Sequence, residues 1–193
     1  MLSVGEIARG TQGALRFLQL DRSAPLHFDN TMAACLRSFW LIALVAPLQV
    51  AVLMLIYGNV SYAADDLEVV LVEALHYVVD WLLFPVIFYE IARLRGWLDH
   101  YPRYISALNW MNLPGMAIVL AVLLLMQVMP PAVGDVLQFG LNVLILYWLT
   151  ATTRLALGVS WTISLALTAV NWLPSQLLSF VVERFLGVVA LGT

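Results

Sequence analysis

Long apolar stretches with few charges alternate with short polar segments along most of the chain. A helix needs about 20 mostly apolar residues to cross the hydrocarbon core of a bilayer. On that criterion the pattern predicts five spans, over about residues 39–57, 67–91, 113–129, 136–153 and 157–182. We therefore expect an all-α polytopic transmembrane bundle over residues 38–193, preceded by an arm over residues 1–37.

The last apolar segment contains Pro174. Proline inside a helix removes one backbone hydrogen bond and kinks or breaks the helix. The pattern therefore allows Pro174 either to bend a single span or to split the segment into a short span and a surface helix. We expect five spans, whereas a sixth span would return the C-terminal end to the side on which the arm lies.

The arm has a helical pattern of its own. Its apolar residues recur at helical spacing: Val4, Ile7, Ala8, Thr11, Leu15 and Leu18. Arg9, Gln12, Arg16 and Gln19 lie on another face. This pattern predicts an amphipathic helix lying in the membrane interface over anionic lipid. In the competing interpretation the helix packs on loops of the same protein.

Composition agrees with a membrane protein and excludes several other classes. Hydrophobic residues make up 63% of the chain and charged residues 11%, against about 25% charged residues in a typical soluble domain. The net charge of −3 excludes nucleic-acid binding through bulk basicity. The single cysteine, Cys35, excludes an internal disulfide and a cysteine zinc site.

The arginines are distributed unevenly between the two expected sides of the membrane. With five spans, eight of the nine lie on one side and only Arg184 lies on the other. Cytoplasmic loops carry the excess of basic residues, so we expect a cytoplasmic N-terminus. The absence of lysine and the abundance of Ala, Leu and Val suggest a GC-rich bacterial genome. The expected location is therefore the bacterial inner membrane.

Three of these arginines, Arg93, Arg95 and Arg103, follow the second span closely. A basic cluster beside a span can hold anionic lipid headgroups. The alternative, which we prefer, is that these arginines only set the orientation.

Ionisable residues gather in the second expected span. Glu73, His76 and Asp80 lie at positions i, i+3 and i+7, on one helical face. Each costs roughly 2.5 to 3.5 kcal/mol at the bilayer centre on insertion scales, so each calls for a partner. The arrangement suits a proton relay. In the preferred alternative, Asp80 and His76 pair with each other or with Asn142 and hold helices together.

A polar stripe runs along the last span with helical spacing. Its members are Ser160, Ser164, Thr168, Asn171, Ser175 and Ser179. Small and polar residues on one face allow helices to pack closely in lipid. Helix packing is therefore the preferred role, and a water-lined path is the alternative.

The later spans also resemble a known family. The residues that carry the resemblance are Tyr104 to Trp110, then Tyr147-Trp148, and then Ala156 to Trp161 before the last apolar segment. In this layout the chain resembles the Yip1-like group of five-span membrane proteins. The resemblance implies a cytoplasmic N-terminal arm and five helices. In eukaryotic members it implies a role as a membrane-traffic scaffold with small-GTPase partners, which we do not transfer to a chain of bacterial composition.

Catalytic motifs such as HExxH, GxSxG and the P-loop do not occur in the sequence. We expect a non-enzymatic accessory subunit or scaffold, with no cofactor or metal, that contacts membrane lipids and either a protein partner or copies of itself. One alternative is a small transporter or proton-coupled channel that uses Glu73, His76 and Asp80. A third is a membrane protein that binds lipid or quinone between its helices.

Overall fold

Five helices in the structure are long and apolar enough to cross a membrane. They belong to a computed structural model that describes residues 2–58 and 60–190. The long helices in these candidate spans are α3 (Leu41–Tyr57), α4 (Asp66–Arg95), α5 (Tyr101–Met126), α6 (Pro131–Leu157) and α7 (Trp161–Leu186). The first candidate span, Met32–Tyr57, also includes the short helix before α3, and the third, Leu98–Met126, includes the short helix before α5. The predictions of an all-α fold and of five helices long and apolar enough to span a membrane are confirmed for the described residues.

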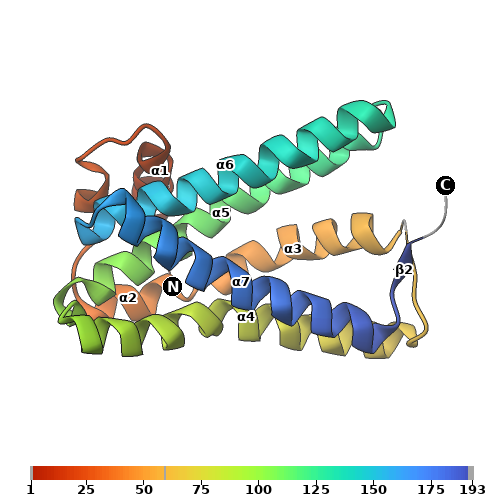
Figure 1. Cartoon of the computed structure of the whole chain (residues 1–193), viewed down its shortest axis with the longest axis horizontal. Helices are drawn as coiled ribbons and strands as arrows, with labels where there is room; N and C mark the ends of the chain where they lie inside the picture. Colours follow the sequence, from red (N-terminus) through yellow and green to blue (C-terminus); the bar gives the residue numbers. More distant parts are fainter. Residues whose placement is uncertain (1, 59, 191–193) are drawn as a thin grey trace.

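Shorter elements lie at the two ends of the long helices. They are α1 (Val4–Leu18), η1 (Ala24–His27), α2 (Met32–Ser38), η2 (Leu98–His100), β1 (Val60–Ser61) and β2 (Val189–Ala190). The strands β1 and β2 pair antiparallel, with Val60 opposite Ala190. This pair joins the segment before α4 to the segment after α7 (Figure 1).

The long helices run side by side along the long axis of the molecule (Figure 1). The short elements α1, η1 and α2 lie at one end, which we call the arm end, and the strand pair lies at the other, which we call the strand end. Helix α5 packs against α3 and α6, and α7 packs against α4 and α6. The α5–α6 hairpin diverges from the α4–α7 pair toward the strand end (Figure 1).

Local capping explains where several helices begin and end. The helices α1, α4 and α7 each begin at a capping side chain, from Ser3, Asp65 and Ser160 respectively. Each of these side chains accepts a hydrogen bond from a backbone N–H group in the first turn of its helix. Gly158 ends α6 at φ 66°, a left-handed conformation that favours glycine. The backbone N–H of Ser3 donates to Glu6 in return, and this hydrogen bond lowers the pKa of the Glu6 carboxyl.

Pro174 does not divide the last helix, because α7 continues from Trp161 to Leu186. Pro85 likewise lies inside α4. In the bilayer core there is no water to form hydrogen bonds with free backbone N–H and C=O groups. A single segment can form these hydrogen bonds internally only as a helix, so the helix continues past one proline. The described chain therefore contains five candidate spans, as preferred from the sequence.

The third span begins earlier than predicted, at Tyr101 instead of Leu113, and ends at Met126 instead of residue 129. Pro102 occupies the first helical turn, where proline is tolerated because the N–H groups there have no partner within the helix. The added turns are buried throughout residues 104–110. Their helical conformation is stabilised by packing against the arm, which a hydropathy pattern does not represent.

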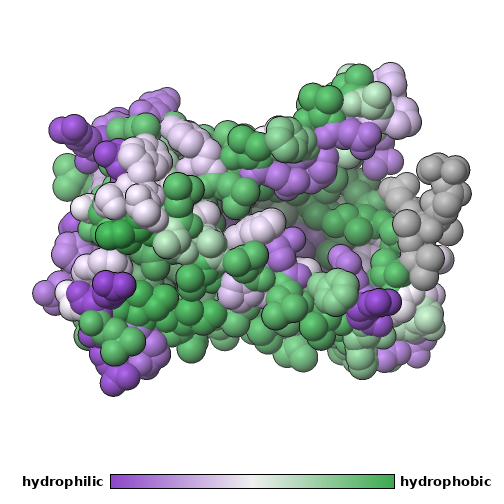
Figure 2. All heavy atoms as spheres, viewed as in Figure 1, coloured by the Kyte–Doolittle hydropathy of each residue, from purple (hydrophilic) through white to green (hydrophobic). Residues whose placement is uncertain are grey.

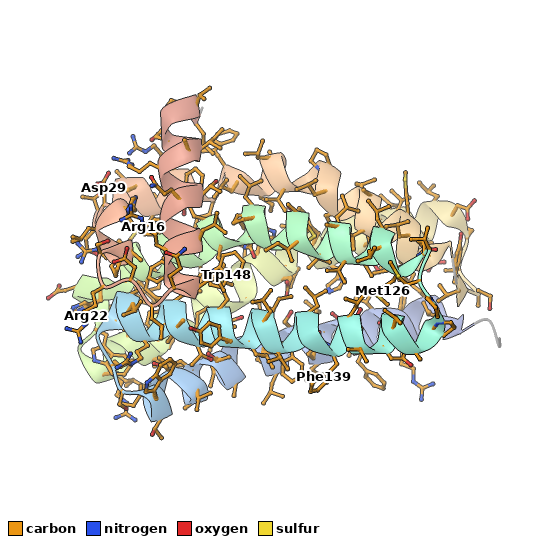
Figure 3. All side chains as sticks on the ribbon, turned by 90° about the horizontal axis from the view of Figure 1, so that it is seen from above. Arg16, Arg22, Asp29, Met126, Phe139 and Trp148 are labelled. Atoms are coloured by element: carbon orange, nitrogen blue, oxygen red, sulfur yellow. The ribbon has the colours of Figure 1, made fainter. Side chains whose placement is uncertain are left out.

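Helix α1 crosses the ends of the long helices and packs against α5 and α6 (Figure 3). Its buried residues are Gly10, Gly13, Ala14 and Phe17. The apolar face predicted from the sequence is different, and part of it stays exposed: Val4 is 84% exposed and Leu15 is 40% exposed. Ile7 and Leu18 of the predicted face also pack partly against the core, so only part of that face stays exposed.

Hydrogen bonds attach the arm to the bundle. The indole N–H of Trp148 on α6 donates to the Ala14 carbonyl over 2.8 Å. Arg103 donates from Nε to the Phe28 carbonyl over 3.3 Å, and Asn109 donates to the Ser38 hydroxyl over 2.8 Å. These contacts link α5 and α6 to successive parts of the arm, so the arm and the spans form one structural unit.

Candidate functional site

A cavity of about 250 Å³ lies between the long helices and is lined by residues from all five of them. In the space-filling view the molecule is hollowed between α6 and the α4–α7 pair, with hydrophilic residues near the hollow (Figure 2). Asp80 lines the cavity near the midpoint of α4. The cavity therefore lies at the depth of the middle of the spans.

The cavity wall carries several polar side chains where an apolar wall would be expected. Its polar and ionisable residues are Gln49, His76, Tyr77, Asp80, Asn109, Asn112, Asn171 and Ser175. Cavities lined only by apolar groups stay dry, whereas polar groups with free hydrogen-bonding capacity hold water. A wall of this composition can bind water or a small polar solute.

The ionisable residues of α4 are connected by hydrogen bonds to α3 and α7. The Tyr57 hydroxyl on α3 donates to Glu73 over 2.6 Å. The other carboxylate oxygen of Glu73 lies 3.0 Å from His76 Nδ1, and His76 Nε2 lies 3.3 Å from the Ser179 hydroxyl on α7. One turn of α7 away, the Ser175 hydroxyl donates to Asp80 over 2.6 Å. We call Tyr57, Glu73, His76, Asp80, Ser175 and Ser179 the intramembrane network.

The geometry of the intramembrane network constrains where protons lie. Ser179 has one hydroxyl hydrogen, and it donates to the Ser175 carbonyl over 3.1 Å. Ser179 can then only accept from His76, so Nε2 carries a proton in this arrangement. A second proton lies between Nδ1 and Glu73, which are in hydrogen-bond contact. A hydrogen bond between Glu73 and His76 thus requires one proton, held either on Nδ1 or on the Glu73 carboxyl.

Asp80 and His76 have different partners from those predicted. Instead of pairing with each other, each contacts a serine of α7. Asn142 lies on the exposed surface of α6 and is not among the described residues that line the cavity. The predicted pairing with Asn142 is therefore wrong, because α6 presents Ile145 and Leu149 to the cavity instead.

The polar stripe of α7 faces two neighbouring helices in turn. Ser164 and Thr168 are buried, and the Thr168 hydroxyl lies 3.0 Å from that of Thr150 on α6. Asn171 and Ser175 line the cavity. Ser160 caps the helix. The first half of the stripe thus packs against α6 and the second half faces the cavity and α4.

The three arginines proposed for lipid headgroups have different surroundings. Arg93 forms an ion pair with Glu90 over 2.6 Å, and Arg103 bonds to the arm. Arg95 is exposed. The three side chains therefore do not converge on one site, and their role in binding lipid headgroups stays a prediction.

Several cavity residues were not identified from the sequence. Gln49 on α3 and Asn109 and Asn112 on α5 are isolated polar residues that share no helical stripe with Asp80. Tyr57, at the end of the first predicted span, was not identified either. The one available signal was that an amide inside an apolar segment calls for a partner, and that signal does not indicate which helix supplies it.

Comparison with family models, with curated proteins and with solved structures finds no match to this chain. The resemblance to Yip1-like proteins therefore stays a prediction based on the residues that carry it.

Proposed function

We propose that this protein is a small proton-coupled transporter of the bacterial inner membrane. The observation that carries the proposal is the intramembrane network, which connects the strand end of α3 and α4 with a polar cavity at mid-span. Ionisable residues at that depth are costly and typically mark ion or proton pathways. These contacts therefore support transport over a purely structural role for Glu73, His76 and Asp80.

An accessory subunit needs a free face for its partner, and the polar stripe of α7 does not provide one. Ser164 and Thr168 are instead covered by the same chain, and Ser175 bonds to α4. A stripe used inside the chain does not call for an external partner, which supports the transport alternative.

The proposed proton path begins near Tyr57 and Tyr62, whose rings are in edge contact at the strand end. Glu73 accepts the proton there and exchanges it with His76 across their 3.0 Å contact. His76 and Asp80 both line the cavity, so cavity water can carry the proton between them. Asp80 then exchanges the proton with a solute that occupies the cavity.

We further propose that the arm end is cytoplasmic and that α1 lies in the membrane interface. Arginines of the arm, of the α4–α5 link and of the C-terminal part of α6 lie toward this end, in agreement with the positive-inside rule. The exposed residues Val4 and Leu15 would enter the lipid while Gly10 and Phe17 contact the bundle.

Proton movement in proteoliposomes tests the proposal. Vesicles loaded with a pH-sensitive dye receive an imposed potential, with and without an external mixture of small amines, carboxylates and neutral solutes. We expect protein-dependent proton flux in at least one condition. His76→Gln should lower it by about tenfold or more, since a relay group contributes 10²–10⁴-fold when proton transfer limits the rate, and Asp80→Asn should abolish it.

Glu90→Gln is the matched control, because Glu90 lies on the same helix but is exposed and paired with Arg93. Its flux should equal that of the unaltered protein. Absence of flux in every condition, or full flux in Asp80→Asn vesicles of normal protein content, would rule out the proposed function.

A further inference from the structure

We infer that the central cavity binds a small organic cation, with Asp80 as its counter-ion. The inference deepens the proposed function, because it names the class of solute that the transporter would carry. Binding itself can be measured without transport, so the two ideas can fail separately.

The charge of the cavity wall favours a cation. Asp80 is the only carboxylate among the described residues that line the cavity, and no arginine lines it. The Ser175 hydroxyl bonds to one carboxylate oxygen, Oδ1. A carboxylate at mid-span is stabilised by a proton or by a cation, and no described residue of the wall other than His76 can supply a positive charge.

His76 does not fill this role in the structure, because its ring nitrogens contact Glu73 and Ser179. Glu73 compensates any positive charge on the imidazole at 3.0 Å. Tyr77 on α4 is the remaining titratable residue of the described wall, and its hydroxyl donates to the Ile42 carbonyl on α3. Helices α3, α5, α6 and α7 contribute amides, a hydroxyl, an indole and apolar groups to the wall.

Aromatic rings around Asp80 indicate an organic cation. Tyr77, Trp81, Phe84 and Trp172 belong to the cavity wall, and the rings of Tyr77 and Trp81 meet edge to face at 6.1 Å between centroids. Ammonium groups are attracted to the faces of such rings, most strongly where water is excluded. A hard metal ion would instead require several oxygen ligands around it, usually with more than one carboxylate.

The amides of the wall supply the remaining recognition. Gln49, Asn112 and Asn171 come from three different helices and offer carbonyl oxygens to the N–H or O–H groups of a solute. An organic anion would face Asp80 without a compensating base. The combination of one carboxylate, aromatic rings and amides fits a small amine or quaternary ammonium ion of a size that a cavity of about 250 Å³ accepts.

A cation and a proton would compete for Asp80. A protonated Asp80 carries no charge and attracts an ammonium group weakly, whereas an ionised Asp80 attracts it strongly. Release of one cation on protonation of Asp80, and release of the proton on rebinding, gives exchange of one for the other without any further group.

Calorimetric titration of the purified protein in lipid nanodiscs tests the inference. The probes are choline and 3,3-dimethyl-1-butanol, its uncharged isostere, followed by tetraalkylammonium ions of increasing size. We expect choline to bind at least about tenfold more tightly than the neutral isostere, since the two differ only in the charge that Asp80 recognises. Tetraalkylammonium ions should stop binding once they exceed the cavity.

Four variants separate charge from folding. Asp80→Asn keeps an acceptor for Ser175 and should lower choline affinity by about tenfold or more, whereas Asp80→Glu should keep much of it. Ser175→Ala leaves the carboxylate charge in place but removes its hydrogen bond from Ser175, so it should lower choline affinity less than Asp80→Asn does. Glu90→Gln should bind as the unaltered protein does. Gel filtration of each variant verifies folding.

Equal binding of choline and its neutral isostere would overturn the inference, and so would equal choline affinity in Asp80→Asn. Displacement of choline by millimolar sodium would show a metal-ion site and would also overturn it. Choline binding without proton movement in vesicles would overturn the proposed function and leave the inference intact. Proton flux without binding of any ammonium ion would overturn the inference and leave the proposed function intact.

Discussion

Single glycines determine how closely α1 approaches the bundle. A Cβ at Gly10 would overlap the indole of Trp110 on α5, and one at Gly13 would overlap His27 and Phe28. The absence of a side chain at these positions thus brings the α1 backbone against α5 and the arm. The sequence pattern did not reveal this face, because glycine contributes little to an amphipathic profile even where it is buried.

Gly10→Ala should therefore loosen α1 from the bundle. Overpacking a close contact costs about 1–3 kcal/mol, so we expect faster trypsin cleavage after Arg9 and Arg16. The control is Gly5→Ala, because a Cβ at Gly5 meets nothing within 4 Å. Cleavage of Gly10→Ala at the rate of the Gly5→Ala control would contradict this account of the packing.

At the scale of elements, α7 joins two parts of the fold. Its first half packs against α6 through Ser164 and Thr168, and its second half reaches α4 through Ser175 and Ser179. Short side chains allow this approach from both sides. The sequence predicted one continuous stripe, whereas in the structure Ser160 caps α7 and the later residues face two different helices.

Leucine at Ser164 or Thr168 should separate α6 from α7. Each substitution adds volume to a buried site, which typically costs about 1–3 kcal/mol, and Thr168→Leu also removes the contact with Thr150. We expect lower melting temperatures for both variants in detergent, measured by tryptophan fluorescence. Thr162→Leu is the control on an exposed part of the same helix, and an equal melting temperature for all three variants would refute the assignment of the packed face.

At the scale of the whole molecule, the two ends differ in charge and construction. The arm end combines α1, η1 and α2 with most of the arginines, whereas the strand end carries the β1–β2 pair and the link between α5 and α6 (Figure 1). If all five candidate spans cross the membrane, the two ends of the described chain lie on opposite sides of it.

Cysteine labelling tests this orientation. In a Cys35→Ala background, a cysteine at Asp29 and one at Asp135 should react with a membrane-impermeant maleimide from opposite sides. Both positions are exposed and lie at different ends of the bundle. We expect Asp135→Cys to be labelled in intact spheroplasts and Asp29→Cys only after lysis. Labelling of both from outside would contradict the proposed topology.

The number of spans and the ionisable face of α4 were predictable because they depend on local sequence. A bilayer requires about 20 apolar residues for each crossing, and a helix places residues 73, 76 and 80 on one side whatever surrounds it. The start of α5 was not predictable in this way. Residues 104–110 in its first turns are buried by the arm and by neighbouring helices.

The cavity and the partners of Asp80 depended on tertiary structure alone. Ser175 contacts Asp80 across 95 residues of sequence, and Gln49, Asn112 and Asn171 converge from three helices. Hydropathy and periodicity record which side of a helix is polar, but not which other helix lies opposite. That choice follows from the fit of small and large side chains between helices, so the composition of the site became visible only once the five helices were placed together.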